Sequence, residues 1–250
     1  MDTGKLYIVA TPIGNLGDIT LRALETLKSV DIILCEDTRV TKNLLAHYAI
    51  EKTLASYHQH TDIKKIKEII SWLEEGKNIA LVTDAGTPGI SDPGGILIHE
   101  VIKTVIPTTK EESLSQSTNG QRSFGGVNPT QDDNVVIPIP GPSAAIAALS
   151  ISGFPTDKFI FMGFPPHKNK RQKYFKEVAV SEYTVVFYES GHRIKKCLIE
   201  LKKHLDPKRK VLVCRELTKK FETIYRGTIE EVSVQMQDER GEFVIVINSL

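Results

Sequence analysis

The chain has 250 residues, of which 40% are hydrophobic and 25% charged, with a formal net charge of +1. These proportions are ordinary for a soluble globular protein. No apolar run approaches the roughly 20 residues needed to cross a bilayer, and the N-terminus lacks the basic start and apolar core of a secretory signal. We therefore expect a cytoplasmic protein that makes no membrane contact.

The charge is divided unevenly along the chain. Residues 1–151 carry 13 Lys and Arg against 18 Asp and Glu, whereas residues 152–250 carry 19 against 13. An anionic partner is therefore expected to bind the second half.

Strands and helices alternate through the first half. Short apolar runs predict strands at Leu6–Ala10, Asp31–Cys35, Ile79–Thr83 and Val135–Ile139. Helices are expected at Thr20–Ser29, Thr38–Ala46, Asp62–Glu74 and Ala144–Ile151, with Asp18 and Asp62 as N-caps and Gly76 as a stop signal. This alternation is typical of a parallel sheet covered by helices.

The second half has more closely spaced strands. They are expected at Phe159–Gly163, Thr184–Tyr188, Val211–Arg215, Thr223–Gly227 and Phe243–Ile247, with helices at Lys170–Val178 and His192–Leu205. The close spacing of the later strands favours an antiparallel portion. The sequence thus predicts two α/β domains, at residues 1–151 and 152–250. A polar segment at 107–134 is expected to be a surface insertion, a lid or an RNA-contacting loop.

Cysteine usage and histidine spacing argue against a metal site. The three cysteines are odd in number and far apart, and Cys35 and Cys214 lie in apolar runs that predict buried thiols. His58 and His60 lack a second pair of ligands at the right spacing. We expect no metal.

Two glycine- and proline-rich turns each follow an expected strand, with the sequences VATPIGNLGDIT from Val9 and TDAGTPGISDPG from Thr83. Open α/β sheets bind ligands beyond the carboxyl ends of their strands. Neither turn contains a phosphate-binding GxxxxGK[ST] or GxGxxG motif, which favours a nucleoside ligand without a phosphate chain.

These two turns resemble the signature loops of the tetrapyrrole methylase superfamily, and most closely its branch that 2′-O-methylates a cytidine ribose in 16S ribosomal RNA. The similarity continues in order through Glu36–Arg39, Pro140–Ala144, Tyr188–Arg193 and Arg215–Lys220. The resemblance implies a mainly parallel N-terminal sheet, a mixed C-terminal sheet and a ligand cleft between the two domains.

The resemblance also implies S-adenosylmethionine as methyl donor. The residues expected to bind it are Pro12, Gly14, Asn15, Asp84, Ala85, Gly86, Ile90, Ser91, Ser143, Ala144, Glu189, Leu217 and Thr218. From the residues alone, Asp84 serves equally well as a turn-stabilising carboxylate. The turn at Gly14 could equally be only the entry to a helix.

Methyl transfer requires an acceptor oxygen aligned with the methyl group and the sulfur, and gains from a nearby base. Asp37 and Arg39 are the preferred catalytic pair because they follow a strand and open a helix. An ion pair or helix cap is the alternative.

A basic run at residues 168–176 is expected to contact RNA phosphates, and a solvated helix face is the alternative. The RNA-binding candidates are Lys168, Lys170, Arg171 and Lys173 from this run, together with Arg193. The resemblance implies 16S ribosomal RNA or the small ribosomal subunit as partner, and a homodimer. Methylation of a tetrapyrrole or a protein residue, or a non-catalytic RNA-binding assembly factor, remain as alternatives.

Overall fold

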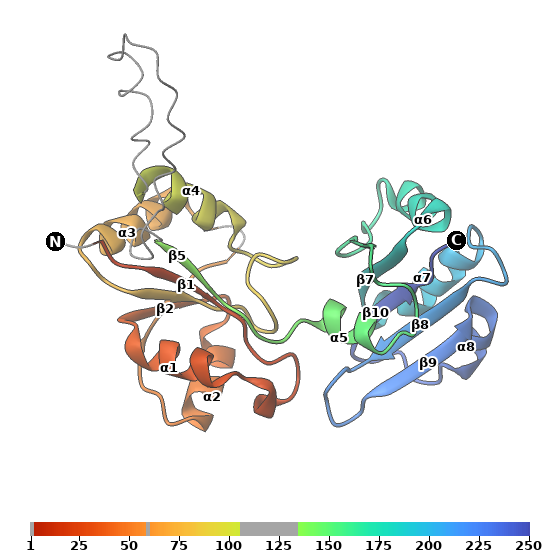
Figure 1. Cartoon of the computed structure of the whole chain (residues 1–250), viewed down its shortest axis with the longest axis horizontal. Coiled ribbons are helices and arrows are strands. Elements are labelled where there is room, and N and C mark those ends of the chain that lie inside the picture. The colour runs from red at the N-terminus through yellow and green to blue at the C-terminus, as the bar shows by residue number, and fades with distance from the viewer. Residues whose placement is uncertain (1–2, 59–60, 106–134) are drawn as a thin grey trace, which may run out of the picture. The chain divides into compact units, whose positions relative to one another are not determined.

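The computed structural model describes residues 3–58, 61–105 and 135–250, and divides into two compact units, each with its own sheet (Figure 1). Unit 1 comprises Met1–Thr11 and Ile19–Gly141, and unit 2 comprises Pro12–Asp18 and Pro142–Leu250. The expected insertion at 107–134 lies outside the described residues.

The sheet of unit 1 contains five parallel strands in the order β3-β2-β4-β1-β5. The strands are β1 (Leu6–Val9), β2 (Ile32–Cys35), β3 (Thr53–Ser56), β4 (Ile79–Leu81) and β5 (Val136–Ile139). The helices that connect them are α1 (Leu21–Ser29), α2 (Thr38–His47), α3 (Ile63–Glu74) and α4 (Gly95–Val105). The parallel sheet expected from the alternating pattern is therefore confirmed.

Helices cover both faces of this sheet, with α1 and α2 on one side and α3 and α4 on the other (Figure 1). Successive side chains of a strand point to opposite faces. Ile8 accordingly packs in the cluster that contains Ile69 of α3 and Leu97 of α4. Val9 packs in the cluster that contains Leu27 of α1. Burial on both faces explains why the strands are continuous apolar runs.

The sheet of unit 2 is mixed, in the order β6-β7-β10-β8-β9. Its strands are β6 (Phe159–Phe161), β7 (Thr184–Ser190), β8 (Lys210–Arg215), β9 (Thr223–Thr228) and β10 (Glu242–Ile247). Only the β6–β7 pairing is parallel, so the predicted antiparallel portion is confirmed. The helices are α5 (Ala144–Ser150), α6 (Arg171–Val180), α7 (Gly191–Lys202) and α8 (Ile229–Gln235).

The two faces of the second sheet are covered by different segments. Helices α6, α7 and α8 pack on one face, around Phe187 and Ile245. The opposite face packs against an unexpected pair of segments, through Leu149 of α5 and through Ile13, which comes from the first turn of the chain. For this reason unit 2 begins at Pro142 rather than at residue 152, and it also includes Pro12–Asp18.

Local start and stop signals were predicted with mixed success. Asp62 caps α3 through a hydrogen bond from the Lys64 N–H, and Gly76 follows the helix with φ +86°, both as expected. The N-cap of α1 is Thr20, whose hydroxyl accepts from the Ala23 N–H, so the assignment to Asp18 was wrong. Asp18 instead ends a short 3₁₀ turn at Leu16–Asp18.

Candidate functional site: two groups of loop residues

The loops after β1 and β4 leave the first sheet at its topological switch point. These strands are neighbours, yet the chain passes from β1 to α1 on one face and from β4 to α4 on the other. Loops that diverge in this way leave a crevice at the carboxyl ends of the strands, where open α/β sheets bind ligands.

The two glycine-rich turns meet at this point through Thr11 and Gly86. The Thr11 N–H donates to the Gly86 carbonyl at 2.9 Å, and the Gly86 N–H donates back to the Thr11 carbonyl at 3.1 Å. The Thr11 hydroxyl also donates to the Thr83 carbonyl at 3.0 Å. Gly86 has φ +86°, a conformation that favours glycine. Sequence reasoning missed Thr11 and Thr83 as site residues, although each immediately precedes a residue that it selected.

Four selected residues of the second turn lie at the surface. Asp84, Ala85, Ile90 and Ser91 are all exposed, and Ser91 has φ +62°, which is uncommon for a residue with a side chain. A strained, exposed loop at a switch point is consistent with a ligand-binding role.

Three carboxylates gather at the ends of β2 and β4. The Asp37 N–H donates to Asp84 Oδ1 at 3.2 Å. Loss of hydration raises the pKa of Asp84, and the nearby negative charge of Asp37 acts in the same direction. Loss of hydration also raises the pKa of Glu36, with a further contribution from the charge of Asp84. A positively charged ligand group near these carboxylates would relieve their repulsion.

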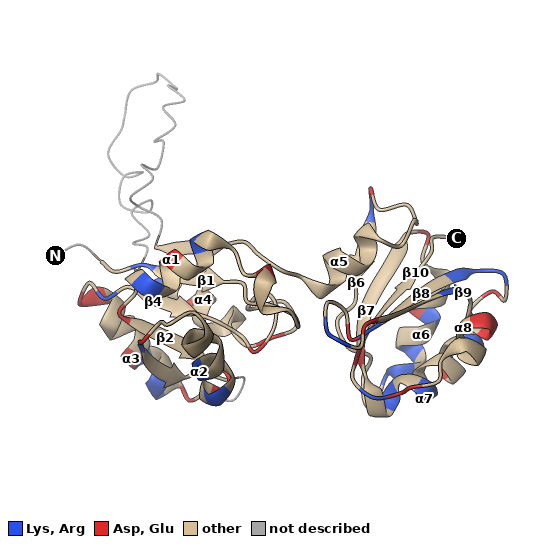
Figure 2. Ribbon diagram, turned by 90° about the horizontal axis from the view of Figure 1, so that it is seen from below, with Lys and Arg blue, Asp and Glu red and all other residues tan. Residues whose placement is uncertain are grey.

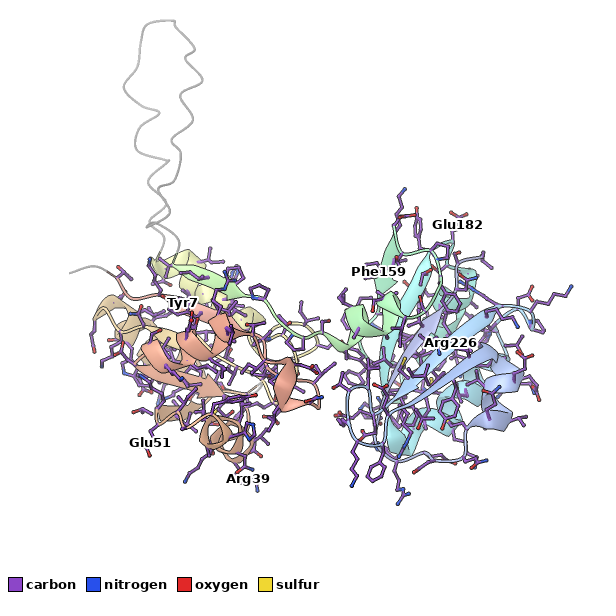
Figure 3. All side chains as sticks on the ribbon, turned by 60° about the horizontal axis from the view of Figure 1, so that its bottom comes forward. Tyr7, Arg39, Glu51, Phe159, Glu182 and Arg226 are labelled. Atoms are coloured by element: carbon purple, nitrogen blue, oxygen red, sulfur yellow. The ribbon has the colours of Figure 1, made fainter. Side chains whose placement is uncertain are left out.

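Asp37 and Arg39 form a helix cap and a surface ion pair. Asp37 Oδ1 accepts from the Arg39 N–H at 2.8 Å, which caps α2, and Asp37 Oδ2 lies 2.6 Å from Arg39 Nη2. These hydrogen bonds from Arg39 lower the pKa of Asp37 to about 2. Asp37 is therefore ionised at neutral pH and a poor proton acceptor. The Arg39 side chain is 88% exposed and projects away from the ribbon (Figure 3).

The first turn contributes a second group of residues, within unit 2. Pro12 and Ile13 are buried, while Gly14 and Asn15 are exposed. A Cβ built at Gly14 would clash with Lys219 Cγ and would lie 3.1 Å from Thr218 Oγ1 and 3.2 Å from the Leu217 carbonyl oxygen. Glycine is thus required for close approach between this turn and the one after β8.

The turn after β8 holds a buried hydroxyl group. Thr218 has φ +66°, and its N–H donates to a Glu222 carboxylate oxygen at 2.6 Å. Its Oγ1 is buried and has no hydrogen-bond partner among the described residues. A buried hydroxyl group without a partner, close to Gly14, is suited to binding a polar ligand.

Ser143 and Ala144 begin α5 on the same face of unit 2 as Ile13 and Leu217. The Ser143 side chain makes no capping hydrogen bond. The Ala145 N–H donates to Tyr188 Oη at 3.2 Å. The sequence singled out Tyr188 only as part of a motif, and its contact with the start of α5 was not predicted.

The structure contradicts a ligand-contacting role for Glu189. Its side chain is fully buried, with Arg193 Nη2 at 2.6 Å and Arg171 Nη2 at 3.4 Å. It is enclosed by two guanidinium groups, so it is a structural ion-pair residue.

The same network corrects two phosphate-binding assignments. The Arg171 side chain is only 4% exposed, and its Nε lies 2.6 Å from a Glu200 carboxylate oxygen. The Arg193 side chain is 13% exposed and is held by Glu189. A buried guanidinium paired with carboxylates is not available to a phosphate on the surface. In contrast, Lys168, Lys170 and Lys173 are exposed. Figure 2 marks Lys and Arg in blue on α6 and α7.

Two further observations bear on cofactors and membranes. Within residues 3–58, 61–105 and 135–250, no group of three or more His, Cys, Asp and Glu could hold a metal ion. All three cysteines are buried and unpaired, as predicted for Cys35 and Cys214. No helix in the described part of the chain has the length and apolar character to span a bilayer.

Comparison with known proteins gives consistent matches over most of the chain. The sequence profile of the tetrapyrrole (corrin/porphyrin) methylases matches residues 5–108 and 131–233. Ribosomal RNA small subunit methyltransferase I of Halalkalibacterium halodurans is 43% identical over 249 residues, covering 98% of this chain and 76% of that protein. The protein of the same name from Thermotoga maritima is 39% identical and covers 98% of both chains.

Solved structures of similar fold are more distant in sequence. The methyltransferase CobJ superposes with a TM-score of 0.65 at 17% identity, covering 99% of this chain and 95% of that one. Uroporphyrin-III C-methyltransferase of Thermus thermophilus, complexed with S-adenosyl homocysteine, superposes with a TM-score of 0.60 at 17% identity, covering 98% of this chain and 97% of that one. At these identities the similarity supports the fold.

Proposed function

We propose that this chain, which belongs to the tetrapyrrole methylase family, is an S-adenosylmethionine-dependent methyltransferase of small-subunit ribosomal RNA. The observation that carries the proposal is the end-to-end match, near 40% identity, with proteins named ribosomal RNA small subunit methyltransferase I. The finer part of the proposal is that the methyl group goes to a ribose 2′-oxygen of a cytidine in 16S ribosomal RNA.

The residues of both groups fit S-adenosylmethionine chemically. The donor carries an adenine, a ribose, a zwitterionic amino acid and a sulfonium cation that supplies the methyl group. Asp84 and the main chain of Ala85 would hold cationic and polar parts of such a ligand, and Gly86 would shape the turn beside it, because its own N–H and carbonyl are bonded to Thr11. The Thr218 hydroxyl, which has no partner among the described residues, and the N–H group of Ala144 at the start of α5 offer further hydrogen bonds. Ile90 and Ser91 of unit 1, and Pro12, Gly14 and Asn15 of unit 2, stay proposed as donor-binding residues.

Asp37 and Arg39 are proposed to position the acceptor. A pKa of about 2 argues against proton uptake by Asp37. Its N–H fixes the Asp84 carboxylate, and its own carboxylate fixes the exposed Arg39 guanidinium. Alignment of an acceptor oxygen with a bound methyl group can supply much of the rate acceleration without a strong base.

Exposed lysines of unit 2 are proposed to bind the RNA backbone. Lys168, Lys170 and Lys173 lie in the half of the chain with excess positive charge. Contacts of this kind give affinity that depends on salt but carry no sequence information. The partner is 16S ribosomal RNA or the assembled small subunit.

Two measurements test the function. Titration calorimetry should show that the purified protein binds S-adenosylmethionine or S-adenosylhomocysteine. Mass spectrometry of 16S ribosomal RNA from a strain lacking the protein should show one cytidine without its ribose methyl group, and the purified enzyme should restore it on small subunits. A protein that binds neither donor nor product would be a scaffold. One that binds the donor but leaves ribosomal RNA unmodified would favour a tetrapyrrole or protein substrate.

The cytoplasmic location and the homodimer stay predictions of the same proposal. Analytical ultracentrifugation of the purified chain measures the oligomeric state directly. A sedimentation coefficient that corresponds to a monomer at micromolar concentration would contradict it.

A further inference from the structure

The segment that joins β6 to α6 carries an exposed aromatic ring next to exposed basic residues. Phe164 keeps 49% of its surface exposed, and Lys168 and Lys170 of the same segment are exposed as well. Among the described residues, Phe164 belongs to none of the four apolar clusters that form the cores. The ring therefore lies outside the apolar cores and keeps about half of its surface accessible.

The backbone around Phe164 is held at three points. The Gly163 carbonyl accepts from the Tyr188 N–H at 2.8 Å. The Pro165 carbonyl accepts from Arg193 Nη1 at 3.4 Å, and the Pro166 carbonyl accepts from Arg171 Nη1 at 3.1 Å. Two successive prolines also fix φ along this stretch. An aromatic side chain on such a backbone loses little conformational freedom when it binds a partner.

The two arginines that hold this segment are themselves fixed from inside unit 2. Arg171 pairs with Glu200, and Arg193 pairs with Glu189, each at 2.6 Å. Buried ion pairs add little net stability, because desolvation offsets their attraction. Their evident structural effect is to hold the Pro165 and Pro166 carbonyls in place.

Neighbouring aromatic rings support the Phe164 ring from one side. Its centroid lies 5.4 Å from that of Tyr188 in a T-shaped contact, and Tyr188 contacts Phe161 at 5.0 Å in the same manner. A supported but half-exposed ring is the arrangement that proteins use to stack an unpaired nucleic-acid base.

We infer that Phe164 is a stacking platform for an unpaired base of the RNA substrate, with Lys168 and Lys170 contacting adjacent phosphates. The inference rests on the proposed function, because it takes RNA as the partner. Duplex RNA keeps its bases stacked on each other, so the platform distinguishes single-stranded from paired RNA. The positive side chains match the phosphates, and the ring supplies affinity that does not depend on salt.

The test compares Phe164→Leu with Phe164→Trp and with a matched control, Phe159→Leu. Phe159 is a 39% exposed ring on β6, before the held segment. Binding of a labelled single-stranded oligocytidine RNA should weaken on the order of tenfold in Phe164→Leu. Affinity should be retained in Phe164→Trp and in Phe159→Leu. Binding of an RNA duplex of equal length should be unchanged in all three.

The salt dependence separates the ring from the lysines. Phe164→Leu should leave the slope of log affinity against log salt unchanged. Lys168→Ala with Lys170→Ala should make that slope shallower by about 0.7 for each phosphate that the protein no longer neutralises. Equal single-strand affinity in Phe164→Leu and wild type would overturn the inference. Calorimetry with S-adenosylmethionine on the same samples tests the proposed function separately, since Phe164→Leu should bind the donor as wild type does.

Discussion

Asp84 is the residue whose ionisation should control donor affinity. Its pKa is raised, chiefly by loss of hydration, so its negative charge is lost at a higher pH than in an unfolded chain. An ionised carboxylate favours a sulfonium cation. Affinity for S-adenosylmethionine, measured by calorimetry, should therefore fall as the pH is lowered from neutral through this raised pKa. Affinity for S-adenosylhomocysteine, which lacks the sulfonium charge, should fall less.

Two variants sharpen this pH test. Asp84→Asn should weaken S-adenosylmethionine binding at neutral pH and remove the difference in pH dependence between donor and product. Asp37→Asn is the comparison variant: it removes the neighbouring negative charge that helps to raise the pKa of Asp84, so the fall in donor affinity should move to lower pH. At neutral pH it should keep donor affinity and slow methyl transfer only if the Asp37–Arg39 pair positions the acceptor. Parallel pH profiles for donor and product in the wild type would place the sulfonium away from Asp84.

At the scale of single elements, the start of α1 offers a direct stability test. The Thr20 hydroxyl accepts from the Ala23 N–H and caps the helix, whereas Asp18 lies in the preceding 3₁₀ turn. Loss of an N-cap hydroxyl typically costs about 1 kcal/mol. Thr20→Ala should therefore lower the free energy of unfolding in urea by about that amount, and Asp18→Ala should leave it nearly unchanged. A larger loss of unfolding free energy in Asp18→Ala than in Thr20→Ala would identify Asp18 as the N-cap.

The elements also show what periodicity can and cannot predict. The long amphipathic helix α3 was predicted within one residue at its start, because its apolar stripe and its Asp62 cap agree. Strand β3 was missed, because it is a short edge strand whose residues are exposed or half-buried and lack an apolar run. Helix α8 was missed for a similar reason, since only Ile229 and Val232 of its seven residues are buried.

Site residues were predictable where a motif contained them and not where a tertiary contact created the role. Asp84 and Gly86 could be found from a glycine-rich turn after a strand. The Thr11–Gly86 bridge joins residues far apart in sequence, so it becomes visible only in the folded chain. The burial of Arg171 could not be read from a basic run, because its carboxylate partners come from β7 and α7.

At the scale of the whole molecule, the first turn belongs to the opposite unit from the strand that precedes it. Ile8 of β1 packs in a core cluster of unit 1, and Ile13 packs against α5 and the turn after β8 in unit 2. The two isoleucines are five positions apart and similarly buried, at 9% and 8% exposure. Alanine variants of these two residues can therefore be compared directly, to determine which core each residue stabilises.

Ile13→Ala and Ile8→Ala should each cost roughly 2–5 kcal/mol, because both remove buried methyl groups from a packed core. The location of the damage should differ. Hydrogen exchange measured on peptic peptides should show faster exchange in α5 and β8 for Ile13→Ala, and faster exchange in α3 and β1 for Ile8→Ala. Faster exchange in α3 for Ile13→Ala, with α5 unaffected, would mean that the first turn packs on unit 1 instead. With the predicted pattern, a mutation near the N-terminus would loosen a core whose other members come from residues 144–246, among them Leu149 and Leu217.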